Sequence, residues 1–237
     1  MAKARKAKIK RPGRRKSYLG RNIAFLTTAL MVVLLLLSPS LYYYGYVSAN
    51  DATALASIAI SLILSFAALS YMLRKGDGVK KTINELGLSN DKFSLKMVVY
   101  GILLFVAYIG VVFLIGIIAY LANKQVNSNV STVIGGYPLY ALVFVAIIAP
   151  INEEIFFRGF AVPRIGVIIS AILFAALHYS YGSYVEVFKA LWFGICAGYL
   201  FKKTRSLYPS IVTHIMVNAT TALLLLHTGM LISLVIR

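Results

Sequence analysis

The sequence predicts an all-α fold: a polytopic integral membrane helical bundle with about seven transmembrane helices, or eight if a short apolar stretch near its end forms a span. Of its 237 residues, 60% are hydrophobic, and the mean hydropathy is +0.82. Several apolar runs approach the ~20 residues that a helix needs to cross the hydrocarbon. The alternating ~10-residue strands of an outer-membrane barrel are absent from the sequence. We expect one membrane-embedded domain, 22–237, behind a basic tail, 1–21.

Positive charge is concentrated in the tail and at the ends of the apolar runs. Ten of the 24 Lys and Arg residues lie in residues 1–21, and the net charge is +17. This pattern predicts a disordered cytoplasmic tail that contacts anionic lipids. Because the remaining cations mostly flank apolar segments, they indicate membrane topology, and we expect no nucleic-acid partner.

The expected spans follow in chain order. The first, about 22–37, has no cleavage site and leads into a tyrosine belt, so we expect it to be retained. A short amphipathic helix, about 79–88, should lie at the membrane surface. The remaining spans cover about 54–73, 97–121, 137–162, 166–178, 187–201 and 208–226.

Basic residues alternate between the two sides of these spans. The positive-inside rule then places the amino terminus in the cytosol and, for seven spans, the carboxyl terminus outside. The stretch 230–236 is too short for an independent span. Two other features are minor: Asn129 begins a glycosylation triplet, and the single cysteine, Cys196, lies in an apolar run that favours a packing role.

Three charged residues interrupt the fourth span: Glu153, Glu154 and Arg158. Each charge near the centre of a span costs roughly 2.5–3.5 kcal/mol on insertion, so such residues are functional candidates, with a helix-bracing ion pair as the alternative. Glu154 and Arg158, four apart, share a helix face and can neutralise each other. Glu153 points about 100° away from Glu154. A carboxylate facing a cavity there is suited to act as a general base.

Other polar residues lie at a similar depth. In an antiparallel hairpin that turns near residues 165–166, His178 meets Glu153, and Phe174 shares the face of His178 and forms a wall of the pocket. His214 and Asn218, four apart, share one face of the last span at an overlapping depth. A glutamate, two histidines and an asparagine from three helices therefore converge.

In order, Glu153-Glu154-x-x-x-Arg158, Phe174-x-x-x-His178 and His214-x-x-x-Asn218 resemble the motifs of the CAAX protease and bacteriocin-processing family. Its best-known branch is the type II CAAX prenyl endopeptidases. The resemblance covers about residues 95–226. It implies an intramembrane protease in the cell membrane, with a cavity that opens to the cytosol, acting near the carboxyl terminus of a prenylated or other membrane-associated substrate. Prenyl proteases of this type have eight spans, whereas seven and a stub are counted here.

The resemblance also implies roles for these positions. Glu153 resembles the residue that activates water, with His178 assisting it. His214 and Asn218 resemble the groups that stabilise the oxyanion, while Glu154 and Arg158 resemble supporting residues. No cofactor is implied.

Two alternatives remain open from the sequence. Glu153, His178 and His214 form a two-histidine, one-carboxylate set that suits zinc, although no H-E-x-x-H motif is present. In a transporter or an immunity-type membrane protein, Glu153 would instead carry a proton or an ion. No inverted internal repeat supports a transporter.

Overall fold

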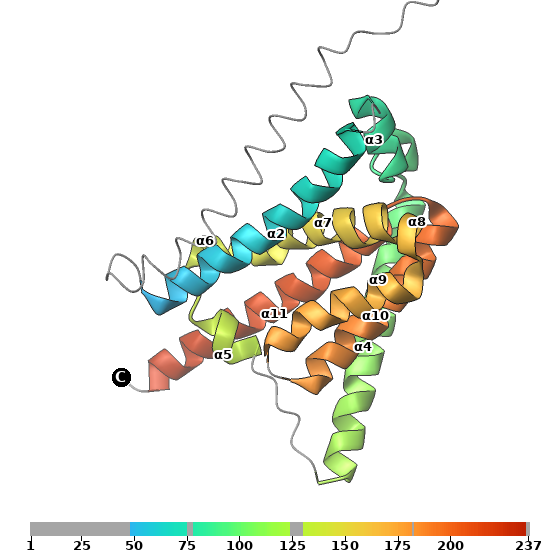
Figure 1. Cartoon of the computed structure of the whole chain (residues 1–237). Coiled ribbons are helices and arrows are strands. Elements are labelled where there is room, and N and C mark those ends of the chain that lie inside the picture. Colours follow the sequence, from blue (N-terminus) through green and yellow to red (C-terminus); the bar gives the residue numbers. More distant parts are fainter. Residues whose placement is uncertain (1–47, 75–77, 124–129, 182, 236–237) are drawn as a thin grey trace, which may run out of the picture.

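A computed structural model describes residues 48–74, 78–123, 130–181 and 183–235, and these residues form helices with no strand among them (Figure 1). Within them, five helices are long and apolar enough to cross a membrane: 50–73, 95–121, 139–165, 184–204 and 208–227. The all-α membrane fold is therefore confirmed. The expected tail and first span, 1–37, lie outside the described residues, so the total of seven or eight spans stays a prediction.

The helical elements carry the labels of Figure 1. Several of them join end to end, because one bent span is divided into α6, η2, α7, η3 and α8. The bounds are α2 Ala49–Arg74, α3 Val79–Glu85, η1 Asn90–Lys92, α4 Leu95–Leu121, α5 Val130–Gly135, α6 Leu139–Val143, η2 Phe144–Ile148, α7 Ala149–Glu154, η3 Ile155–Ala161, α8 Val162–Ile165, α9 Val167–Leu177, η4 His178–Tyr181, α10 Tyr184–Thr204 and α11 Tyr208–Val235.

The last helix is longer than the sequence predicted. The apolar stretch after residue 229 was expected as a continuation of the last span or as a half-helix, and it continues α11 as far as Val235 without a break. It therefore forms no separate helix. The segment predicted as a short fifth span is a helix, α9, which is apolar but only 11 residues long, so its crossing of the membrane stays a prediction.

Helix α11 lies at the centre of the bundle, where it contacts α4, α7 and α10, and α2 runs alongside α7 (Figure 1). The most extensive contact between two helices of the described residues is that of α9 with α10. Gly194 and Gly198 allow this approach, since a Cβ atom there would lie 3.0 Å from Ala171 and 2.8 Å from Val167. Small residues at such positions let helix backbones pack closely in membranes.

Two π-helical segments, η2 and η3, lie immediately before and after α7. A π-helix interrupts the regular backbone bonding, and such interruptions are frequent at functional sites. Here two backbone carbonyl groups accept hydrogen bonds from other helices. Asn218 Nδ2 donates to the Val145 carbonyl in η2 at 2.9 Å, and Ser170 Oγ donates to the Phe157 carbonyl in η3 at 2.7 Å. The glutamate pair is thus held on a short helix anchored on both sides.

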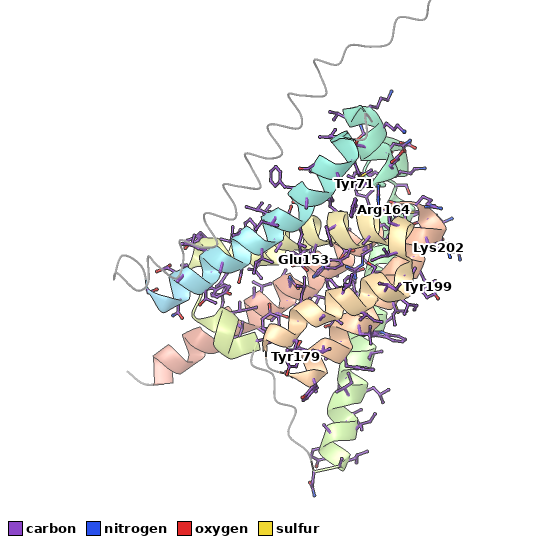
Figure 2. All side chains as sticks on the ribbon, in the orientation of Figure 1. Tyr71, Glu153, Arg164, Tyr179, Tyr199 and Lys202 are labelled. Atoms are coloured by element: carbon purple, nitrogen blue, oxygen red, sulfur yellow. The ribbon has the colours of Figure 1, made fainter. Side chains whose placement is uncertain are left out.

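One end of the bundle collects most of the described cations, and we call it the basic end. Figure 2 shows Arg164 and Lys202 there, near Tyr71. Loop contacts hold this end together: Leu207 N donates to the Gly87 carbonyl at 3.0 Å. The cations of the basic end are Lys80, Lys81, Lys92, Lys96, Arg164, Lys202, Lys203 and Arg205.

Candidate active site

The three charged residues of the bent span separate as their spacing predicted. Arg158 donates to Glu154 at 2.8 Å, and both side chains are buried, with exposed fractions of 1% and 0%. The Arg158 guanidinium also lies 4.3 Å from the ring centroid of Phe174 and 4.8 Å from that of Phe193. A buried charge needs such compensation, because an unpaired one is strongly destabilising.

A third helix contributes to the same cluster. His214 on α11 lies with Nδ1 2.9 Å from Glu154 Oε1, the oxygen that also accepts from Arg158. Spacing alone did not predict this contact. It joins α7, η3 and α11 through one buried carboxylate, and it fixes the orientation of the imidazole ring.

Glu153 makes no hydrogen bond or salt bridge with Glu154 or Arg158 among the described contacts, and its side chain lines a cavity of about 230 Å³. In Figure 2 Glu153 lies between the basic end, marked by Arg164, and the opposite end, marked by Tyr179. The cavity brings together the predicted residues, and Glu154 and Arg158 lie outside its lining. Its polar and aromatic lining comprises Ser57, Tyr108, Tyr137, Glu153, Phe174, His178, Tyr181, Glu186, Lys189, Phe193, His214, Asn218 and Thr221.

The two histidines of the cavity are each oriented through one ring nitrogen. His178 Nδ1 lies 2.9 Å from the Phe174 carbonyl, which can only accept, so Nδ1 is the donor. In the neutral ring, His178 Nε2 is then an acceptor. His214 presents Nε2 to Glu153 Oε2 at 3.8 Å, which is longer than a direct hydrogen bond.

Asn218 and His214, which the resemblance assigns to the oxyanion, each already make one hydrogen bond within the protein. One amide hydrogen of Asn218 is used by the Val145 carbonyl, and Nδ1 of His214 is used by Glu154. Asn218 retains one further amide hydrogen, because its NH₂ group carries two. Its part in stabilising an oxyanion stays a prediction.

Sequence reasoning did not select the residues that α10 contributes. The cavity is lined by Glu186, Lys189 and Phe193. Glu186 and Lys189 form a salt bridge. The spacings of three and four residues between the three side chains place them on one helix face. The two charges near the start of an apolar helix could have identified this face from the sequence. Tyr181 was also missed. Burial, together with the charge of Glu153, raises the pKa of its hydroxyl, so it stays a protonated donor.

The zinc alternative requires its ligands to converge. Among the described residues, no group of three or more His, Cys, Asp or Glu side chains is arranged to hold a metal ion. The buried Nδ1 atoms of His178 and His214 are already bonded to protein oxygens. The Nε2 atoms of the two rings are the nitrogens that could still bind a metal ion. Whether the protein binds zinc is therefore to be measured directly.

Comparison with known proteins was informative for one part of the chain. Residues 135–220 match the family model described as type II CAAX prenyl endopeptidase Rce1-like. The matched segment contains all three motifs, from Glu153 to Asn218, so the resemblance drawn from them is confirmed. No curated protein and no solved structure matches the chain. The Rce1-like match, with the five helices of the described residues that are long and apolar enough to cross a membrane, indicates a multi-pass membrane protease of the CAAX endopeptidase type, with a membrane-associated protein as substrate.

Proposed function

We propose that this protein is an intramembrane endopeptidase in which Glu153 activates a water molecule to hydrolyse a peptide bond near the carboxyl terminus of its substrate. One observation carries the proposal: of two adjacent glutamates, Glu154 is occupied by Arg158 and His214, while Glu153 lines the cavity. The Rce1-like match supports the same reaction class.

The reaction needs a base, an acid and a place for negative charge. Glu153 accepts a proton from water as the oxygen attacks the peptide carbonyl, and then delivers that proton to the leaving amine. The neutral Nε2 atom of His178 is an acceptor that orients the water. Since Glu153 and His214 are separated by 3.8 Å, a water molecule can lie beside both at ordinary hydrogen-bond distance.

The tetrahedral intermediate places negative charge on the former carbonyl oxygen. The second amide hydrogen of Asn218 is the donor that we assign to this oxygen. A donor of this kind contributes about 2.7–4 kcal/mol to transition-state stabilisation. Its bond to the Val145 carbonyl holds the amide in place before substrate binds, so little reorganisation is needed.

The wall of the cavity contains apolar as well as polar side chains. Apolar side chains form part of its wall, and they suit a lipid-modified or otherwise hydrophobic peptide. These are Val130, Ile134, Leu142, Val145, Val217 and Ala222. Prenylated peptides are therefore the first substrates to test, with unmodified peptides of the same sequence beside them.

The test compares purified wild-type protein, Glu153→Gln and the matched control Glu85→Gln, a similar change on the exposed surface of α3. Each is incubated in detergent with both peptides, and the fragments are identified by mass spectrometry. We expect cleavage by wild type and Glu85→Gln, and a loss of at least ~100-fold in Glu153→Gln. Equal cleavage by all three proteins would contradict the proposal, as would intact peptide in every reaction.

A further inference from the structure

The ion pair of α10, Glu186 and Lys189, lies in an apolar helix that is long enough to cross a membrane. Both side chains are mostly buried, with exposed fractions of 10% for Glu186 and 18% for Lys189. A charged residue in a spanning helix is costly, and it generally faces the protein interior or a water-filled cavity. Both residues line the cavity that contains Glu153, so the pair faces the candidate active site.

The position of Glu186 has a structural explanation that does not extend to Lys189. Ser183 is the N-cap of α10, and its hydroxyl accepts a hydrogen bond from the backbone N–H of Glu186. A serine followed three residues later by a glutamate is typical of a helix start, and a negative charge in the first turn complements the helix dipole. A lysine in the next turn is not part of that arrangement. Glu186 therefore begins the helix, and its salt bridge holds the Lys189 ammonium at the cavity wall.

Lys189 supplies a positive charge to a cavity that also holds two carboxylates. Among the described residues of the lining, it is the one lysine or arginine, while Glu153 and Glu186 are acidic. Its ammonium carries three hydrogens, and the bond to Glu186 uses one of them. Two hydrogens are therefore left for a ligand in the cavity.

Phe193 connects Lys189 with the reacting groups. It lies four residues further along α10, about 6 Å at 1.5 Å per residue. The centroid of its ring lies 5.0 Å from that of His214, and His214 Nε2 lies 3.8 Å from Glu153 Oε2. An extended peptide advances by ~3.3–3.6 Å per residue. The ammonium therefore lies within the reach of a few peptide residues from a bond placed beside Glu153.

We propose that Lys189 binds the terminal carboxylate of the substrate and thereby places the peptide bond beside Glu153. The assignment rests on the proposed function, because a bond near the carboxyl terminus is cleaved only if the charged terminus enters the cavity with it. A carboxylate without a partner is strongly disfavoured against an apolar wall, and the negative charges of Glu153 and Glu186 repel it. Lys189 is the cation that offsets these costs, so the substrate is a chain with a free carboxyl terminus.

Amidation of the substrate tests this, because it removes the terminal charge and nearly preserves the size of the peptide. The cleavage assay is run with one prenylated peptide as the free acid and as the carboxyl-terminal amide. The proteins are wild type, Lys189→Gln, Lys189→Arg and the matched control Lys202→Gln, exposed at the basic end. We expect wild type and Lys202→Gln to prefer the acid by at least ~10-fold in kcat/KM, through a higher KM for the amide. Lys189→Gln should cleave both peptides equally, and Lys189→Arg should restore the preference.

Comparing two peptides on one protein preparation removes the effect of a lower folded yield. Equal cleavage of acid and amide by wild type would overturn the role of Lys189 while the protease function stands, and so would a preference that survives in Lys189→Gln.

Binding without turnover is the second measurement, by fluorescence anisotropy of both labelled peptides with Glu153→Gln. We expect the acid to bind at least ~10-fold more tightly than the amide, and this difference to disappear when Lys189→Gln is added. Such a result without any cleavage by wild type would support the Lys189 site and contradict the proposed reaction. Equal binding of the two peptides, or binding of neither, would overturn the site.

Discussion

His214 on α11 and Glu154 on α7 meet in the buried interior, with Nδ1 and Oε1 separated by 2.9 Å. This contact ties the last helix to the glutamate pair and orients the His214 ring so that Nε2 lies toward Glu153. The two glutamates, though adjacent in sequence, therefore have different environments. Glu154 holds the helices together, and Glu153 is available to the cavity.

Replacing Glu154 should damage the fold. Glu154→Gln keeps the size of the side chain but leaves Arg158 without its carboxylate, and loss of one partner of a buried pair costs about 3–5 kcal/mol. We expect a lower thermal unfolding midpoint in detergent and a lower folded yield by size-exclusion chromatography. Glu153→Gln is the matched control and should retain the wild-type midpoint. Identical midpoints for the two variants would contradict the assignment of a stabilising role to Glu154 and not to Glu153.

The aromatic rings around Arg158 should also contribute to stability. Phe193→Leu keeps an apolar side chain but removes a ring that lies 4.8 Å from the guanidinium, at an expected cost of about 0.5–2 kcal/mol for the cation–π contact alone. Phe188→Leu, on the exposed side of the same helix, is the control. Thermal unfolding should separate the two variants. If Phe188→Leu unfolds at as low a temperature as Phe193→Leu, the contact between Phe193 and Arg158 does not contribute to stability.

Asn218 should act mainly on the chemical step. Asn218→Ala removes the proposed oxyanion donor, so we expect kcat to fall by about 10²–10³-fold with a smaller change in KM. Thr220→Val, at an exposed position of α11 outside the cavity lining, is the control and should retain kcat within a few-fold. A rise in KM at constant kcat in Asn218→Ala would instead indicate a role in substrate binding.

Metal dependence separates the two protease mechanisms. If Glu153 activates water directly, the purified protein should contain well under one zinc ion per chain and keep its activity after exhaustive chelation. Elemental analysis alongside the cleavage assay measures both. Stoichiometric zinc that is lost together with activity, and restored with it, would reassign Glu153, His178 and His214 as ligands.

The helices and several contacts of the site could be predicted from the sequence, because each depends on residues close together in the chain. The apolar runs predicted the helices, and the spacing of four between Glu154 and Arg158 predicted their ion pair. The same helical spacing predicted that Glu153 faces a cavity. His178 lines that cavity too, at the depth that the hairpin geometry predicted.

Other features depend on contacts between distant parts of the chain. The bond from His214 to Glu154 and that from Asn218 to Val145 require the relative rotation of helices, which periodicity does not fix. The π-helical segments around α7 have no simple composition signal, although they orient the site.

The central claim is that a water molecule, deprotonated by Glu153, attacks the peptide bond. A single-turnover reaction in water enriched in oxygen-18 tests it most directly, with mass spectrometry of both the product and the Glu153 peptide. The account predicts one oxygen-18 atom in the new carboxyl terminus and none in the Glu153 side chain. Oxygen-18 in Glu153 would contradict it, because the carboxylate would then have attacked the substrate itself.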